Sequence, residues 1–279
     1  MKQIKKYVLL IIFLFSSFYF TNQEILTMRD KDEIMKQIDK NSEKYTIASI
    51  DAIVSEKTIV PGVKGQMVDR EKSYNKMKQY GNYNETLTVM KEVEPNISID
   101  SYYDKYIEKG NNQKRRIALV FPITDEEMMK KILMILKREK IRGTFFIDGN
   151  QIDDLVLFIK KYTNHEYELL SFEGEYNPYY IKTAETYLEN ITKKETKYCY
   201  TEEDNKKLLN ICGKNKHHTI QPKLVLSKDL TYQVKNQLEN GLILSIHLND
   251  NHLDELSIMI NYIKTKGYQF ETLDELLKE

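Results

Sequence analysis

From Arg116 to the end of the chain, short apolar runs alternate with longer amphipathic segments. Runs of this length, rich in Val, Ile, Leu and aromatic residues, are typical of buried strands. We expect seven strands, at residues 117–121, 143–147, 168–172, 197–200, 223–226, 242–247 and 268–272. The segments between them have apolar residues at helical spacing, and strands that alternate with helices form a parallel sheet. Seven short buried strands favour an α/β barrel, which carries its site at the carboxyl ends of the strands.

The first 113 residues lack this regular alternation. Residues 24–46 are highly charged, with sparse apolar positions at helical spacing, and predict a helical stalk. Residues 47–113 contain short strand-like runs, Pro and Gly turns and one short helical stretch, which predicts a small α+β cap domain. The barrel is therefore expected to occupy residues 114–279.

The N-terminus has the pattern of an export signal, because Lys2, Lys5 and Lys6 precede an apolar run at residues 7–20. As a helix this run spans about 21 Å, short of the ~30 Å hydrocarbon core, which favours a signal peptide. No small-residue cleavage site follows, however, so we interpret residues 1–23 as an uncleaved signal-anchor that forms a membrane helix. Lysines on the short N-terminal side then place the remainder on the extracytoplasmic face, membrane-anchored, or secreted if the signal is cleaved.

Charge and cysteine content narrow the function classes. Lys+Arg and Asp+Glu both number 42, so the net charge is zero, and no basic patch is interleaved with aromatic residues. A nucleic-acid partner is therefore not expected. The spacing of Cys199 and Cys212 fits no zinc signature. We favour two buried thiols, with a disulfide in an oxidising compartment as the alternative.

Four stretches carry a resemblance to a known family: Ala-Leu-Val-Phe at 118–121, Gly-Thr-Phe-Phe-Ile-Asp-Gly at 143–149, Gly-Leu-Ile-Leu-Ser-Ile-His at 241–247, and Gly-Tyr-Gln-Phe-Glu-Thr-Leu-Asp-Glu-Leu-Leu at 267–277. In order and separation they resemble the polysaccharide deacetylase (NodB-homology) family, over roughly residues 114–279. The resemblance implies a distorted (β/α)7 barrel. It also implies a zinc-type divalent metal and carboxylates that remove acetyl groups from N-acetylglucosamine-containing glycans.

The residues that this chemistry needs are replaced. Pro122 and Ile123 occupy the positions of the family's two aspartates, one a base and one a metal ligand. Phe172 and Tyr176 occupy the positions of its two metal histidines. None of these four can bind a hard cation or take a proton from water. Only His247 matches a catalytic-type position, so we predict a degenerate deacetylase homologue without a metal or other cofactor, and without a confidently assigned catalytic residue.

The replacements suggest two roles for the aromatic side chains. Phe172, Tyr176, Tyr198 and Tyr200, together with His247, are candidates for a groove that stacks sugar rings. The alternative is that the aromatic residues fill the former metal cavity. The first interpretation predicts an envelope protein that binds envelope glycan or peptidoglycan without turnover and contacts the membrane through its N-terminal helix.

Two further hypotheses stay open. One is an active, metal-dependent glycan N-deacetylase with atypical ligands, and the other is a structural ectodomain that binds a protein partner. The atypical ligands would be Asp125, Glu173, Glu175 and His247. A second, less complete set of metal-binding residues is His217, His218 and Cys212.

Overall fold

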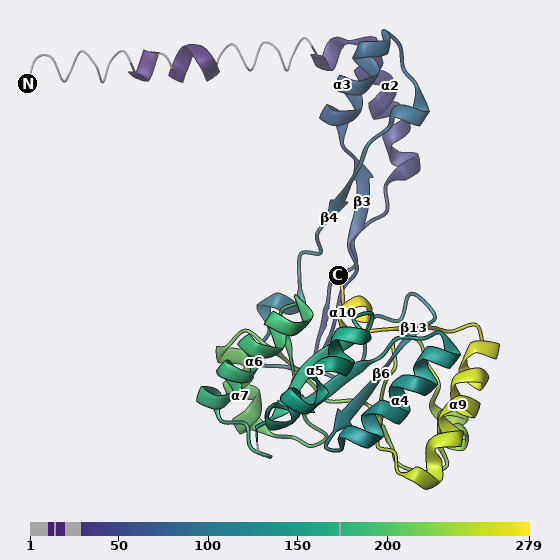
Figure 1. Ribbon diagram of the computed structural model, residues 1–279. Helices are drawn as coiled ribbons and strands as arrows, with labels where there is room; N and C mark the ends of the chain where they lie inside the picture. Colours follow the sequence, from purple (N-terminus) through teal and green to yellow (C-terminus); the bar gives the residue numbers. More distant parts are fainter. Residues whose placement is uncertain (1–10, 14, 20–28, 173) are drawn as a thin grey trace, which may run out of the picture. The chain divides into compact units, whose positions relative to one another are not determined.

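The computed structural model describes residues 11–13, 15–19, 29–172 and 174–279, which form two compact units (Figure 1). The first unit contains the described residues up to Ser49 together with Lys64–Glu94. The second contains Ile50–Val63 and Pro95–Glu279. The chain therefore enters the second unit, returns to the first, and then completes the second.

The predicted N-terminal membrane helix is wrong. Residues 11–13 and 15–19 are helical, but no helix in the described part of the chain is long and apolar enough to cross a membrane. The rest of the expected segment, which is most of residues 1–23, lies outside the described residues. The physical reason is length, since the apolar run is too short to span the hydrocarbon core.

The first unit contains two helices that pack against each other and a two-stranded antiparallel sheet. Its elements are α2 (Glu33–Ser42), α3 (Arg70–Tyr80), β3 (Gly65–Val68) and β4 (Met90–Val93). Each helix begins at an Asp, because the Asp32 side chain accepts a hydrogen bond from Ile34 N and Asp69 accepts one from Lys72 N. The core of this unit is small and consists of Ile34, Met35, Ile38, Val68 and Met77.

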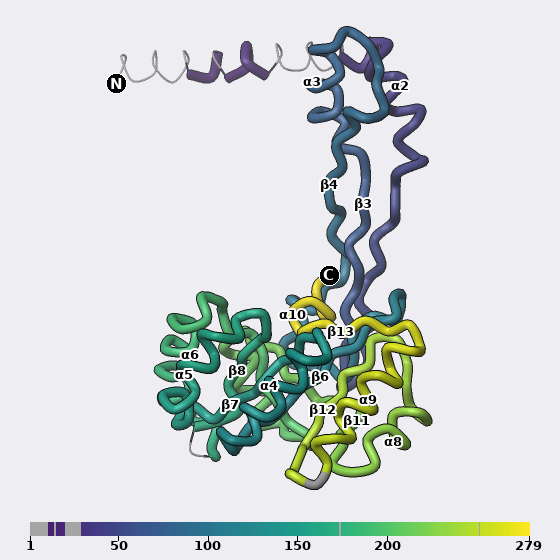
Figure 2. Tube along the Cα trace, turned by 45° about the vertical axis from the view of Figure 1, so that its right-hand side comes forward, coloured from purple at the N-terminus to yellow at the C-terminus, as the bar shows by residue number. Residues whose placement is uncertain are grey.

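The second unit is built on a six-stranded parallel sheet with the order β11-β12-β6-β7-β8, and β13 pairs with the first part of β6 (Figure 2). These strands are β6 (Arg116–Ile123), β7 (Thr144–Asp148), β8 (Glu166–Ser171), β11 (Leu224–Leu226), β12 (Ile243–Ile246) and β13 (Gln269–Glu271). The predicted α/β class with a parallel sheet is therefore confirmed.

Helices cover the outer face of this sheet in the same order as the strands beneath them, with α6 next to α5, α5 next to α4, α4 next to α9, and α9 next to α8. The helices of this unit are α4 (Glu126–Glu139), α5 (Ile152–Lys161), α6 (Pro178–Thr192), α7 (Lys206–Lys214), α8 (Leu230–Gln237), α9 (Leu253–Thr265) and α10 (Leu273–Leu276). Asp125 caps α4, because its carboxylate accepts from Glu127 N at 3.1 Å.

The seven strands expected for a distorted barrel are all present, but they are divided between two sheets. β9 (Tyr198–Tyr200), β10 (His218–Ile220) and β5 (Tyr106–Ile107) form a separate three-stranded parallel sheet. In the described residues, no backbone ladder joins β8 to β9, although the two strands are neighbours. β5 and β10 were not predicted. β5 also comes from residues 47–113, which were expected to form a separate cap domain. A short antiparallel hairpin, β1 (Ile53–Val54) and β2 (Ile59–Val60), completes the unit.

Alternate residues of the strands pack into two different cores, because successive side chains of a strand point to opposite faces of the sheet. Ile117, Leu119 and Phe121 of β6 pack outward against the helices in the larger cluster. Ala118 and Val120 of the same strand point to the other face and join Phe146, Tyr198, Tyr200 and Ile220. This second cluster lies between the two parallel sheets and forms the apolar interior beneath the carboxyl ends of the strands.

Candidate functional site

A hydrogen-bonded cluster lies where β9 and β12 end. The buried Tyr200 hydroxyl is 2.5 Å from Glu202 Oε1 and 2.5 Å from Ser245 Oγ. Glu202 Oε1 also hydrogen bonds to His247 Nε2. The backbone N–H of His247 donates to Leu226 O of β11 at 2.8 Å, which fixes the histidine at the strand end. The cluster therefore connects two strands that belong to different sheets.

The cluster has a buried end and an open end. Ser245 is fully buried and Tyr200 is 7% exposed, whereas the side chains of Glu202 and His247 are 35% and 42% exposed. Burial, followed by the neighbouring Glu202 carboxylate, raises the pKa of Tyr200 above its ordinary value, so its hydroxyl stays protonated and donates to Glu202. A ligand at this edge would meet one carboxylate and one imidazole, which can accept and donate hydrogen bonds and exchange protons.

The residues at the family's metal positions do not fit a metal. Ile123 is buried in the outer core, and Pro122 has no ligating atom in its side chain. The described residues contain no group of three or more His, Cys, Asp or Glu side chains that could hold a metal ion. Pro122, Ile123 and Phe172 therefore supply no side-chain oxygen or nitrogen that could bind a hard cation.

The four aromatic candidates do not gather in one groove. Phe172 packs against Gly149 and Ala184, and its ring stacks on Tyr180 with centroids 5.3 Å apart. The Tyr176 hydroxyl lies 3.1 Å from Cys199 Sγ, and Tyr198 is buried between the sheets. Only Tyr200 meets His247, through Glu202. The structure thus places three of the four side chains in packing positions.

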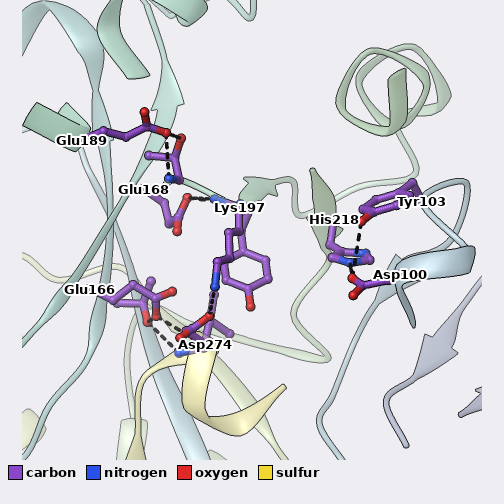
Figure 3. Close-up of polar contacts among 12 residues, drawn as sticks. Asp100, Tyr103, Glu166, Glu168, Glu189, Lys197, His218 and Asp274 are labelled. Atoms are coloured by element: carbon purple, nitrogen blue, oxygen red, sulfur yellow. Dashed lines mark hydrogen bonds and ion pairs between the residues drawn. The ribbon is translucent and has the colours of Figure 1, made fainter. Parts of the chain in front are cut away.

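The atypical metal ligands are also dispersed. Asp125 caps α4, Glu175 is exposed beside the bridge that its backbone makes with Phe172, and Glu173 lies outside the described residues. His217 lies 3.3 Å from Glu185. His218 Nε2 is 3.1 Å from Asp100 Oδ1, and the ring stacks on Tyr103 (Figure 3).

Cys199 and Cys212 form a disulfide that joins β9 to α7, so the favoured interpretation of two thiols is wrong. Both residues are fully buried, and Tyr176 and Leu208 pack around them. The disulfide removes Cys212 from any set of metal ligands, because a metal ligand must be a thiolate.

Sequence reasoning missed three polar residues at this edge. Glu202 and Ser245 complete the cluster of Tyr200 and His247, and Asp148 orders the loop after β8. The Asp148 carboxylate accepts from Ser171 Oγ at 2.5 Å, from Gly174 N at 3.0 Å and from Asn150 N at 3.2 Å. Their place in the sequence could have identified two of them, since Asp148 is the last residue of a buried strand and Glu202 comes two residues after another.

Two tyrosines are exposed at the start of α6, which follows β8. Tyr179 is 78% exposed and Tyr180 is 50% exposed, and their rings meet edge to face with centroids 5.4 Å apart. Helices that follow parallel strands begin at the carboxyl edge of the sheet, so these rings belong to the same edge as the polar cluster.

Comparison with known proteins gives one related sequence and several related folds. No family model matches the chain. The chain is 26% identical over 273 residues to the uncharacterized protein YlxY of Bacillus subtilis strain 168, covering 89% of this chain and 85% of that protein.

The related folds belong to carbohydrate esterases. A wild-type family 4 carbohydrate esterase (CE4) pseudoenzyme from Bacillus anthracis has a TM-score of 0.65 at 23% identity, covering 89% of this chain and 96% of that chain. A mutant of this pseudoenzyme with restored enzymatic activity has a TM-score of 0.66 at 23% identity, covering 89% and 99%. A peptidoglycan N-acetylglucosamine deacetylase has a TM-score of 0.56 at 21% identity, covering 64% and 95%. The chain therefore has the fold of the CE4 polysaccharide deacetylases, and the resemblance expected from its sequence is confirmed.

Proposed function

We propose that the chain is a non-catalytic relative of the CE4 deacetylases that binds N-acetylated envelope glycan at the carboxyl ends of its strands. The observation that carries the proposal is the replacement of the complete metal and base set by Pro122, Ile123, Phe172 and Tyr176. Hydrolysis of an acetamide needs an activated water and a polarised carbonyl, and these side chains supply neither. A pseudoenzyme and a peptidoglycan deacetylase with the same fold support glycan as the ligand class.

The ligand would meet both polar and apolar groups. Glu202 and His247 offer an acceptor and a donor for hydroxyl or acetamide groups. The exposed rings of Tyr179 and Tyr180 offer apolar faces with a polar tip. Small-molecule sites combine aromatic walls with a few placed polar groups, and a sugar has both polar edges and apolar faces.

The compartment is part of the same proposal. Disulfides persist in oxidising environments and are rare in reducing cytosol. The Cys199–Cys212 disulfide therefore supports a site of action outside the cytoplasm, where envelope glycan is accessible.

The test is calorimetric titration of the purified chain with N-acetylglucosamine oligomers, together with an assay for released acetate in the presence of zinc, cobalt or manganese. We expect saturable binding and no acetate. Acetate release that a chelator abolishes would overturn the non-catalytic assignment. Absence of binding to every oligomer and to peptidoglycan fragments would overturn the glycan assignment.

A pair of neighbouring variants locates the binding site. Glu202→Gln removes the charge that links Tyr200 to His247 and is expected to weaken binding about tenfold, the value of one charged hydrogen bond. Glu203→Gln makes the same change one residue later, on an exposed side chain, and should leave affinity unchanged. Equal effects of the two variants would place the ligand elsewhere.

A further inference from the structure

The two parallel sheets of the second unit meet at a seam between β8 and β9. β8 pairs with β7 and β9 pairs with β10, and no backbone ladder in the described residues joins β8 to β9. The N–H groups at the start of β9 therefore need acceptors other than a neighbouring strand.

The carboxylates of two glutamates, the buried Glu168 and the half-buried Glu189, take the place of that ladder (Figure 3). Glu168 Oε2, from β8, accepts from the backbone N–H of Lys197 at 2.9 Å and of Tyr198 at 3.1 Å. Glu189 Oε1, from α6, accepts from the N–H and the hydroxyl of Thr196 at 3.1 and 3.2 Å. The position of β9 relative to β8 thus depends on side chains that can change charge.

A second glutamate on β8 secures the neighbouring element. Glu166 Oε2 accepts from Thr144 Oγ1 of β7 at 2.7 Å and from the N–H of Asp274 at 3.2 Å, at the start of α10. Thr144 Oγ1 in turn accepts from Leu273 N at 2.9 Å. Glu166 and Glu168 are two residues apart on one strand, so both point to the interior face.

Both glutamates are removed from bulk water, since Glu166 is 6% and Glu168 is 1% exposed. Burial raises the pKa of Glu166 to about 7, and burial together with the neighbouring Glu166 charge raises the pKa of Glu168 well above its ordinary value. Both line a cavity of about 330 Å³, which gives water and protons a route to them.

Nearby cations do not neutralise the pair. The other charged groups that line the cavity are Arg142, Lys194, Glu195, Lys197, Asp274 and Glu275. The Lys197 ammonium lies 2.5 Å from Asp274 Oδ1, and Arg142 pairs with Glu275. Two of the three cations therefore already have carboxylate partners, and Lys194 is on the exposed rim.

We infer that Glu166 and Glu168 form a proton-controlled clasp across the seam, which holds β9 in place while the pair is protonated and loosens it when the pair ionises. Two like charges on adjacent interior positions repel each other and attract water into the cavity. Loosening starts at the Lys197 and Tyr198 amides, two residues before Tyr200 at the other end of the strand. The inference concerns a pH response of the fold and does not depend on glycan binding.

The direction follows from linkage. The folded-state pKa of Glu166 is raised above the unfolded value, so its stabilising contribution is complete in acid and is lost as pH rises through about 7. Burial lowers the pKa of His165, His217 and His218, which reduces their contribution to any pH response above pH 6.5. The glutamine variants below separate the carboxyl pair from the remaining titratable groups.

The experiment is native-state hydrogen exchange of the full chain from pH 6.5 to 8.5, with rates corrected for intrinsic exchange. If Glu166 alone titrates, the opening constant of the Lys197 and Tyr198 amides should rise at least about fourfold over this range. If Glu168 also titrates, the opening constant should rise further, by up to about tenfold for each pH unit. The Phe145 amide of β7 serves as the internal reference, since its strand is paired on both sides.

Variants decide whether Glu166 and Glu168 cause the pH dependence of exchange at the β9 amides. Glu166→Gln and Glu168→Gln keep an amide oxygen that can accept the same N–H bonds, and each should flatten the pH dependence. Glu195→Gln changes an exposed carboxylate at the rim of the same cavity and should retain it. If β9 amides show the same pH dependence in wild type and in Glu166→Gln, or none in wild type, the clasp is overturned. Glu166→Gln alone suffices for this decision if Glu168→Gln fails to fold.

Discussion

Removing the Cys199–Cys212 disulfide should lower the free energy of unfolding of the second unit by an amount that follows from the length of the loop it closes. The two cysteines are 13 positions apart and close a loop that contains most of α7. A crosslink over a loop of this length restricts the unfolded chain by about 3 kcal/mol. The double substitution to Ala should lower the free energy of unfolding by at least that amount, because both side chains are fully buried and loss of their sulfur atoms also leaves a small cavity.

The assay is urea denaturation followed by circular dichroism, with and without a reductant. Wild-type protein in reductant should approach the stability of the double alanine variant, and the variant itself should not respond to reductant, because the chain has only 2 cysteines. A thiol titration of the native protein provides the control for the oxidised state. Two free thiols in protein purified from an oxidising compartment, or equal stability of wild type in both conditions after verified reduction, would refute the reasoning.

Three further substitutions test individual features. Gly241→Ala should destabilise the protein by more than about 1 kcal/mol, because Gly241 has a φ of +78° and an added Cβ would lie 2.4 Å from a backbone oxygen. Gly267→Ala should lose less stability in the same thermal denaturation, because Gly267 has a similar φ of +79° but an added Cβ would make only an ordinary contact, 3.5 Å from the Arg115 side chain. Tyr200→Phe should lower the free energy of unfolding, measured by urea denaturation, by about 1–3 kcal/mol, because it leaves the buried Ser245 hydroxyl without its partner. Adding Ser245→Ala should recover part of this loss. His165→Gln should lose about 2 kcal/mol less unfolding free energy than wild type between pH 7 and pH 4.5. Burial lowers the pKa of His165 to about 4, so below pH 6.5 the unfolded histidine is protonated while the buried ring stays neutral, and folding of the wild type must release that proton. Equal losses in the two proteins would contradict this.

The regular part of the fold could be predicted because strong local patterns encode it. The apolar runs that became β6, β7 and β12 are long enough to show their burial, and the helices between them have an apolar stripe. β5 and β10 could not be predicted, because two or three residues show no period and their pairing depends on residues far along the chain. The seam between β8 and β9 could not be predicted either, because the absence of a ladder depends on how two strands are placed and not on the sequence of either one.

The candidate site was predicted only in part. The resemblance identified His247 and the replaced positions Pro122 and Ile123. It did not identify Glu202, which meets His247 only when β9 and β12 are brought together from different sheets. Aromatic residues were a weak guide to a groove, because a buried Tyr such as Tyr198 and an exposed Tyr such as Tyr179 are indistinguishable in sequence.

The pairing of β5 with β10 has a consequence for how the chain folds during synthesis. Tyr106 pairs with Thr219, so this strand is synthesised roughly 110 residues before its partner exists. Contacts of such long sequence separation slow folding, because the intervening loop must be closed before the pairing is gained. The pairing of β5 with β10 must therefore wait while β6 to β9 are made, and the three-stranded sheet completes late. We expect β6, β7 and β8 to assemble early, because their connections are short, and the rate-limiting step of refolding to be the long-range pairing of β5 with β10 and of β12 with β6.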